Sequence, residues 1–144
     1  MDACQKRLIL ENITTFLPLP GEMSETDFIN RLCEASGAGI LLDATNLFIN
    51  SRNHNFDPVV WLKELNPASI IQLHIVGYSV HDGVWQDHHA AAVQDDLVEL
   101  MQEVVAYSSV QAVILERDAH FPPIPELTLE LSRLEDACET ARVH

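Results

Sequence analysis

Four short apolar runs divide the chain, and each of them ends on an acidic or imidazole side chain. Aliphatic residues dominate positions 8–10, 40–42, 70–73 and 112–115. Runs of this length are typical of strands in a buried parallel sheet. The side chains at their ends are Glu11, Asp43, His74 and Glu116. Because α/β proteins bind ligands at the carboxyl ends of their strands, we expect these four side chains to form one site.

Helix signals separate the apolar runs. Ser24, with Asp27 three residues later, forms a variant capping box, and Gly37 is typical of the residue that follows a helix. Asp57 followed by Pro58 is typical of a helix start, with Asp57 as the N-cap. The apolar spacing predicts two further helices, over residues 95–107 and from about residue 125 onward.

Two polar stretches, residues 47–56 and 79–92, are predicted as loops. The element order is then βαβαβαβα, which predicts an α/β domain with a parallel sheet and right-handed crossovers. Four βα units make half of a (β/α)₈ barrel of the TIM type, and we expect all 144 residues to form this one domain. The outer strands, at Leu8 and Ala112, would leave two open edges. We therefore expect a homo-oligomer or a partner that supplies the other half of the barrel.

Composition narrows the choice of partners and compartment. A formal net charge of −14 argues against nucleic acid, since such proteins cluster Lys and Arg to displace counterions. No apolar run approaches the roughly 20 residues that span a membrane, and the first residues lack the layout of a signal peptide. The three cysteines, Cys4, Cys33 and Cys138, are far apart, and none belongs to a CxxC pair. This favours a reducing compartment, and we expect the cytoplasm.

The chemistry of the strand ends indicates a metal site. Carboxylates and imidazoles suit iron, manganese or zinc, whereas a single carboxylate at a strand end is often only a helix cap or an ion-pair partner. Asp87 and His89 add two ligands, because alternate residues of an extended segment face the same side. Such a set can hold two metals about 3.5–4 Å apart. The predicted metal ligands are Glu11, Asp43, His74, Asp87, His89 and Glu116.

An ordered set of motifs covers nearly the whole chain, from residue 7 to residue 134. The motifs are Leu10-Glu11-Asn12, Leu41-Leu42-Asp43-Ala44-Thr45-Asn46, Asn53-x-x-Phe56-Asp57, His74-Ile75-Val76-Gly77, Asp87-x-His89 and Glu116-Arg117-Asp118. Together they resemble the multinuclear non-heme iron-dependent oxidase family, long described as a bacterial domain of unknown function. Its known members modify cysteines in ribosomally made precursor peptides, as in methanobactin maturation.

The resemblance implies a TIM-type barrel with two or three irons at its mouth, of which the chain matches the second, C-terminal half. By motif position, the six predicted ligands match iron ligands of the family. Tyr78 stands where many relatives have a histidine, and Thr45 replaces a frequent asparagine. Residues near the motifs are expected to contact substrate or to support the ligands: Asn12, Asn46, Asn53, Tyr78, Arg117 and Asp118.

The activity implied by the resemblance is iron-dependent oxidation of a peptide cysteine. No side chain is an obvious general base, so the catalytic residues are not assigned. Because the family draws iron ligands from both barrel halves, we expect weak iron binding and little turnover by this chain alone. Activity is expected with the other half, a precursor peptide and its recognition protein. Two alternatives stay open: a divalent-metal isomerase or hydrolase of the xylose-isomerase type, and a non-catalytic half-barrel that binds metal or serves as an assembly partner.

Overall fold

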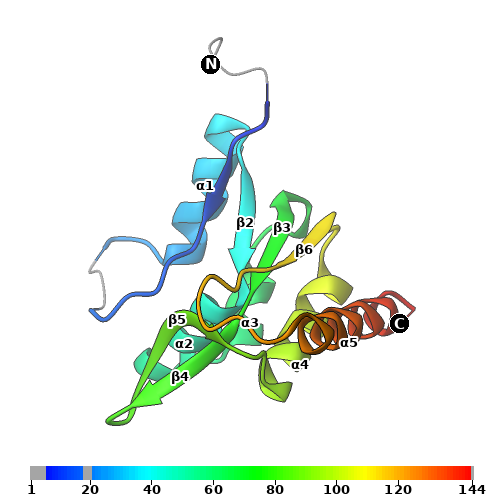
Figure 1. The fold of residues 1–144 in the computed structure, drawn as a ribbon. Helices are drawn as coiled ribbons and strands as arrows, with labels where there is room; N and C mark the ends of the chain where they lie inside the picture. Colours follow the sequence, from blue (N-terminus) through cyan, green and yellow to red (C-terminus); the bar gives the residue numbers. More distant parts are fainter. Residues whose placement is uncertain (1–5, 18–20, 144) are drawn as a thin grey trace.

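The computed structural model describes residues 6–17 and 21–143. A parallel sheet lies at its centre, with the strand order β1-β2-β3-β6 (Figure 1). The α/β class and the parallel sheet of four strands are as the apolar runs predicted. The strands are β1 (Ile9–Glu11), β2 (Gly39–Asp43), β3 (Ile70–Ile75) and β6 (Ala112–Leu115).

The register of the strands aligns their carboxyl ends. Asp43, the last residue of β2, pairs with His74 on β3, and His74 pairs with Ile114 on β6. Glu11 ends β1, and Glu116 follows the last residue of β6. The four chemically active residues therefore lie along one edge of the sheet.

Four helices and a short 3₁₀ turn connect or flank the strands, and capping residues that the sequence signals mark lie at the ends of α1 and at the start of α3. Ser24 accepts a hydrogen bond from the Asp27 N–H at the start of α1, and Gly37 has a φ of 73° at its end. Asp57 accepts from the N–H groups of Val59 and Val60 at the start of α3. These elements are α1 (Glu25–Ser36), α3 (Pro58–Glu64), the 3₁₀ turn (Pro67–Ser69), α4 (Asp95–Tyr107) and α5 (Ile124–Arg142).

Residues 47–56, predicted as a loop, lie mostly in a fifth helix, so that prediction is wrong. Helix α2 (Ala44–His54) begins directly after β2, with Asp43 as its N-cap. Four of its polar residues, Thr45, Asn46, Asn50 and Ser51, are buried, and their side chains form hydrogen bonds to backbone groups. Asn50, for example, accepts a hydrogen bond from the Thr15 N–H and donates one to the Ile13 carbonyl. The polar residues that led to the loop prediction thus form the contact between α2 and the segment after β1.

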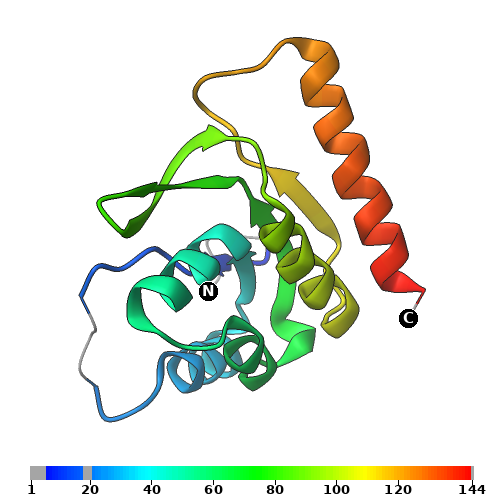
Figure 2. The ribbon, with the colours of Figure 1, turned by 90° about the horizontal axis from the view of Figure 1, so that it is seen from below.

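The second predicted loop, residues 79–92, is mostly a β-hairpin, which corrects the sequence-based expectation. Strands β4 (Gly77–His81) and β5 (Val84–Ala91) pair antiparallel and form a sheet of their own (Figure 2). Asp82 and Gly83 form the two-residue turn, and both have a positive φ, of 51° and 79°. This conformation is the one that favours Asp-Gly in tight hairpins.

The core lies between the sheet and the helices. Leu42 and Leu73 are fully buried and belong to one cluster with Leu62 of α3 and Met101 of α4. Side chains that alternate with these along the strands point to the opposite face, where Ile114 is 40% exposed. The face of the sheet away from the helices is therefore open.

Among the described residues, β1 pairs only with β2 and β6 pairs only with β3. Apolar side chains near these two edges are exposed, including Leu8 at 56% and Leu131 at 49%. A parallel sheet of this kind, with helices on one face, is compatible with part of a barrel. No helix in the described ranges is long and apolar enough to cross a bilayer.

Candidate metal centre

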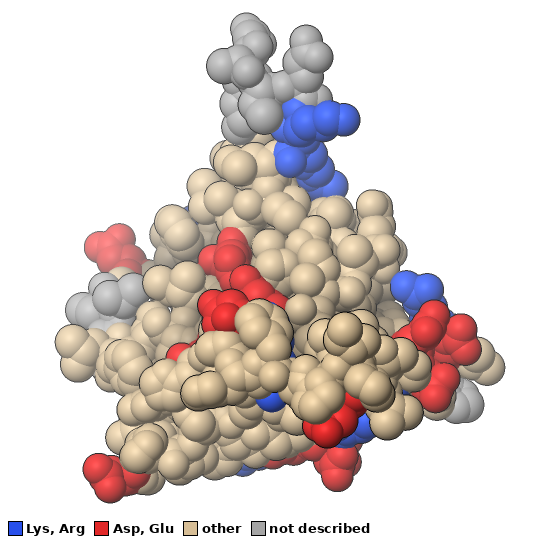
Figure 3. All heavy atoms as spheres, viewed as in Figure 1, with Lys and Arg blue, Asp and Glu red and all other residues tan. Residues whose placement is uncertain are grey.

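Side chains from all four strand ends of the parallel sheet converge. Glu11, Asp43, His74 and Glu116 each offer one ligand atom, and these atoms all lie within 4.8 Å of one another. Asp43 is fully buried and Glu11 is exposed, so the cluster reaches from the interior to the surface. In the orientation of Figure 1, acidic side chains gather near the middle of the face, beside a broad surface without charges (Figure 3).

Asp43 is fixed by a pair of backbone hydrogen bonds to one neighbouring side chain. Asn12 donates from Nδ2 to the Asp43 carbonyl at 3.0 Å and accepts the Asp43 N–H at 2.8 Å. Oδ1 of Asp43 accepts the Asn46 N–H at 2.6 Å. Oδ2 is buried without a hydrogen-bond partner. A buried, unpaired carboxylate oxygen is costly, and a bound cation would offset that cost.

Burial is the main reason that the pKa of Asp43 is raised from 3.8 to about 7. The Asn46 N–H opposes this rise, while the negative charges of Asp87, Glu11 and Glu116 add to it. Near neutral pH the carboxyl of Asp43 is therefore close to half-protonated without metal. A cation that displaces this proton would relieve both the burial and the mutual repulsion of the carboxylates.

His74 has a hydrogen-bond partner at each ring nitrogen. Nδ1 lies 3.0 Å from Oε2 of Glu116, and Nε2 lies 2.8 Å from Nε2 of Gln72. The sequence interpretation missed Gln72. Its position two residues before His74 on one strand, and hence on the same face, is the signal that could have identified it.

Asp87 and His89 reach the cluster from β5. Nε2 of His89 lies 2.7 Å from Oδ2 of Asp87, and Nδ1 lies 4.0 Å from Oε2 of Glu116. Burial lowers the pKa of His89, but the nearby carboxylates of Asp87, Glu116 and Asp118 outweigh it, so the pKa is raised. The structure thus brings all six predicted ligands to one region. Their role as metal ligands stays a prediction.

Three of the six predicted supporting residues adjoin the cluster. Asn12 and Asn46 bind Asp43, and Asn46 also donates from Nδ2 to the Asn12 carbonyl at 3.1 Å. Asp118 is exposed, with Oδ2 3.9 Å from Nδ1 of His89. These contacts make Asn12 and Asn46 supports of Asp43, and they place Asp118 at the rim.

The other three supporting residues contact the hairpin or lie within it. Arg117 donates to the Ala90 carbonyl at 3.0 Å and to Glu130 at 3.2 Å, so it ties β5 to α5. Tyr78 donates from its hydroxyl to Asp96 at 2.9 Å. Asn53 binds the backbone of Trp85. None of these recorded contacts is to a predicted metal ligand, so direct substrate contact by these three residues stays a prediction.

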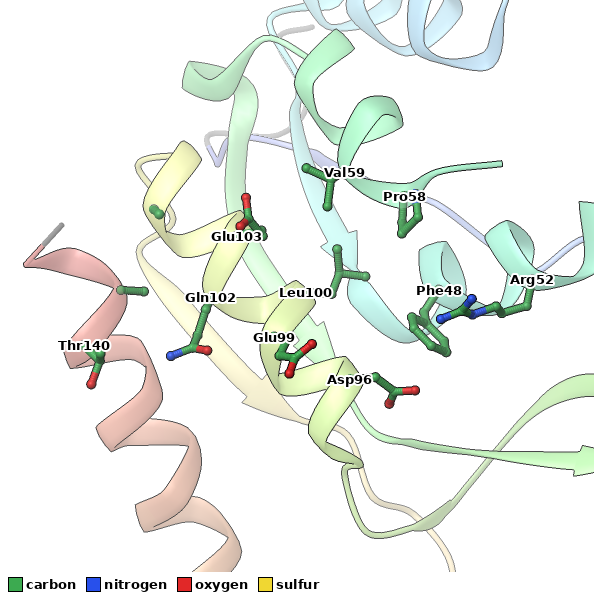
Figure 4. Close-up of a pocket in the computed structure, with 12 residues that line it drawn as sticks. Phe48, Arg52, Pro58, Val59, Asp96, Glu99, Leu100, Gln102, Glu103 and Thr140 are labelled. Carbon is green, nitrogen blue, oxygen red and sulfur yellow. The ribbon is translucent and has the colours of Figure 1, made fainter. Parts of the chain in front are cut away.

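A separate groove of about 600 Å³ lies among α2, α3, α4 and α5. Figure 4 shows the Arg52 guanidinium against the Phe48 ring, with Asp96 and Glu99 projecting from α4. None of the six predicted metal ligands lines this groove. It is therefore distinct from the candidate centre.

The donor set at the centre is oxygen and nitrogen only. Carboxylates with imidazole fit iron, manganese or zinc, as predicted from the strand ends. Cys33 is buried in α1 and Cys138 is half-buried in α5, away from the cluster, while Cys4 lies outside the described residues. The unpaired oxygen of Asp43 and the convergence of carboxylates both fit a divalent cation.

Comparisons with known proteins identify relatives of the chain. Residues 1–139 match the model of a family described as RiPP precursor modification enzyme MbnB/TglH/ChrH. A UPF0276 protein of Streptomyces avermitilis is 36% identical over 135 residues, which are 93% of this chain and 28% of that protein. A UPF0276 protein of Chromobacterium violaceum is 32% identical over 135 residues, 93% of this chain and 49% of that protein.

A UPF0276 protein of Pseudomonas aeruginosa is also 32% identical, over 136 residues that make up 94% of this chain and 48% of that protein. The chain therefore spans about half the length of the latter two relatives, and a smaller share of the Streptomyces protein.

Proposed function

The chain belongs to the MbnB/TglH/ChrH family of RiPP precursor modification enzymes, and on this premise we propose that it supplies one half of an iron-dependent oxidative enzyme that modifies peptide cysteines. The observation that carries the proposal is the convergence of Glu11, Asp43, His74 and Glu116 within 4.8 Å. Asp87 and His89 extend this set toward the hairpin through Glu116. Six oxygen and nitrogen donors in one region suit more than one metal ion.

Iron is the proposed cofactor, and these six side chains would hold it. When bound, iron would supply the redox chemistry for oxidation of the cysteine. The chain's own residues prepare the site for the cation. Asn12 and Asn46 fix Asp43, and contacts with Gln72 and Glu116 orient the ring of His74. Asp43 must lose its proton to bind, so metal affinity should rise as the pH increases through about 7.

A peptide substrate is supported by the openness of the site. Glu11 and Asp118 are exposed, and Figure 3 shows acidic side chains beside a broad surface without charges. A site of this kind admits a chain segment rather than enclosing a small molecule. The cysteine thiolate of such a peptide would bring its own negative charge, which the bound cations would balance.

We further propose that strands from a second copy or from a first-half partner pair with the open edges of β1 and β6. The cluster would then lie at the mouth of a TIM-type barrel, where enzymes of this fold bind substrate. The exposed apolar side chains of Leu8, Ile114 and Leu131 support such a contact, because large apolar side chains at strand edges favour association. Full activity would require the ligands of both halves and a peptide-recognition protein.

The test combines metal content with product formation. The chain is purified anaerobically with Fe(II), and bound iron is measured for the native protein and for His89→Ala. His88→Ala is the matched control, because His88 is the neighbouring histidine on β5, is exposed, and contacts Gln86 instead of the cluster. We expect His89→Ala to lose iron and His88→Ala to retain it. Equal iron content in all three proteins would refute the site.

The activity assay supplies a cysteine-containing precursor peptide, air, and the missing barrel half, and it follows the peptide mass. We expect a mass change with the native chain that His89→Ala loses. Robust modification by the chain alone would contradict the need for a second half. Iron binding without modification in the complete mixture would favour a non-catalytic metal-binding role.

A further inference from the structure

Two carboxamide side chains bind the β4–β5 hairpin from outside. Asn53 on α2 donates from Nδ2 to the Trp85 carbonyl at 2.9 Å and accepts the Trp85 N–H at 3.1 Å. Gln94, the residue before α4, donates from Nε2 to the Tyr78 carbonyl at 2.9 Å and accepts the Tyr78 N–H at 3.2 Å. Each carboxamide therefore pairs with one strand residue much as a neighbouring strand would, on β5 and on β4.

The hairpin needs such support. A two-stranded hairpin is marginally stable by itself, and its outer backbone groups lack strand partners. Strands β4 and β5 pair with each other and with no strand of the parallel sheet in the described ranges. Their turn, residues 81–84, is exposed. Backbone hydrogen bonds from Asp118 and Ala119 hold the His89 carbonyl at one end of β5. The position of the rest of the hairpin relative to the four strand ends depends on side-chain contacts.

Tyr78 and Trp85, the residues that the two carboxamides bind, lie close to the predicted metal ligands of the hairpin. Tyr78, held by Gln94, pairs directly with Asp87 across the two strands. Trp85, held by Asn53, lies two residues before Asp87 on the same strand, a separation of about 7 Å. A shift of the backbone at either point would therefore move Asp87, and with it His89, relative to Glu116.

Aromatic packing also holds the hairpin, but it defines the position of the strands less closely than the hydrogen bonds do. The ring of Tyr78 stacks on Phe48 at 5.2 Å and lies 4.6 Å from the ring of Trp85. Arg52 covers Phe48 at 4.7 Å, as Figure 4 shows. Stacked rings tolerate small sliding movements, whereas paired hydrogen bonds to one backbone residue define its position. Loss of one carboxamide should leave the hairpin folded but free to shift.

We infer that Asn53 and Gln94 are positioning residues of the metal centre, which hold the hairpin at Trp85 and Tyr78 and so place Asp87 and His89 against Glu116. The inference rests on the proposed function, because it assigns these two ligands to the same centre as the strand-end residues. It extends the sequence prediction for Asn53, and Gln94 had no predicted role.

The test uses Co(II) as the probe, because its visible absorption reports the number and geometry of the ligands. Native chain, Asn53→Ala and Gln94→Ala are titrated under the same conditions. Asn30→Ala is the matched control, because Asn30 also forms two backbone hydrogen bonds, to the Glu64 carbonyl at 2.8 Å and from the Asn66 N–H at 2.9 Å. Those bonds join α1 to the segment after α3, away from the hairpin.

We expect Asn53→Ala and Gln94→Ala to bind Co(II) about tenfold more weakly, with an altered spectrum, as is typical when a residue that orients a ligand is lost. Asn30→Ala should bind like the native chain. Asn53→Gln, which keeps the carboxamide, should recover part of the affinity. If the hairpin variants bind like the native chain, or if Asn30→Ala weakens binding equally, the positioning role is overturned.

Hydrogen exchange separates this inference from the proposed function. The amides of residues 84–91 should exchange faster in Asn53→Ala and at native rates in Asn30→Ala. A native chain that takes up no cobalt would refute the metal site, and the exchange rates would then decide the positioning role alone. Equal exchange in the two variants would overturn it. If Asn53→Ala fails to fold, Gln94→Ala and Asn53→Gln supply the same comparison.

Discussion

Replacing Asp43 with asparagine should stabilise the chain when no metal is bound. Asp43 is fully buried, and its Oδ2 lacks a hydrogen-bond partner. Burial, followed by the charges of Asp87, Glu11 and Glu116, raises the pKa of this carboxyl to about 7. Asparagine keeps an oxygen that can accept the Asn46 N–H, so the N-cap of α2 is retained. The variant removes the buried charge and little else.

The magnitude follows from the shift of the pKa between the unfolded and folded states. The ordinary value is 3.8, and the folded value is about 7. Between these values the folded state keeps a proton that the unfolded state has lost, so the free energy of unfolding falls as the pH rises from about 4 to about 7. The loss is about 2 kcal/mol at pH 5 and about 4 kcal/mol at pH 8. The advantage of Asp43→Asn should therefore grow by about 2 kcal/mol between these pH values.

Urea denaturation followed by tryptophan fluorescence, in the presence of a chelator at pH 5, 6, 7 and 8, measures this difference. Asp57→Asn, at the exposed N-cap of α3, controls for a change of capping residue. A native chain that is more stable than Asp43→Asn at pH 8 would contradict the reasoning. So would a difference between the two proteins that does not change with pH.

Three further changes test other parts of the structure. His74→Ala should lower bound iron, measured by elemental analysis, while it changes the free energy of unfolding by about 1 kcal/mol or less, because His74 lies outside the core; unfolding of the variant would refute this. Arg117→Ala should cost about 3 kcal/mol in urea denaturation, because it leaves the 9%-exposed Glu130 unpaired, and Arg117→Ala with Glu130→Gln should recover part of the loss. Ile114→Lys, on the open face, should shift the native assembly toward monomer in analytical ultracentrifugation, and a native chain that is monomeric at micromolar concentration would remove the basis for this prediction.

The strand ends could be predicted because one local pattern determines them. Each apolar run is short, and the polar residue that ends it must lie at the carboxyl edge of a parallel sheet. The convergence of Glu11, Asp43, His74 and Glu116 follows from this rule alone. Likewise, Ser24, Gly37 and Asp57 mark helix ends because capping depends on a few neighbouring residues.

Helix α2 could not be found in the same way, because it buries polar side chains together with apolar ones and so shows no separate apolar face. Asn46, Asn50 and Ser51 are buried, and the two asparagines bind the chain segment after β1. Hydrophobic periodicity detects helices that bury one apolar face. It therefore misses a helix whose buried carboxamides form hydrogen bonds to the backbone of a neighbouring segment. The same limit hid Gln94, whose two bonds to Tyr78 depend on how the hairpin lies in space.

The hairpin, in contrast, did carry a local signal. Asp82-Gly83 is a preferred two-residue turn, and it separates two stretches of β-forming residues. Many polar residues around Asp87, His88 and His89 favoured the loop interpretation instead. These polar residues lie in a strand because β5 directs Asp87 and His89 toward the cluster. Residues required by a site can override the local preference for a loop.

Iron-edge anomalous diffraction tests the central claim most directly. Crystals of the chain grown anaerobically with Fe(II) would reveal the position of any bound iron without reference to activity. We expect an anomalous peak within bonding distance of the side chains of Glu11, Asp43, His74 and Glu116, which converge at the strand ends. Iron bound only at other surfaces would contradict the assignment of the metal centre.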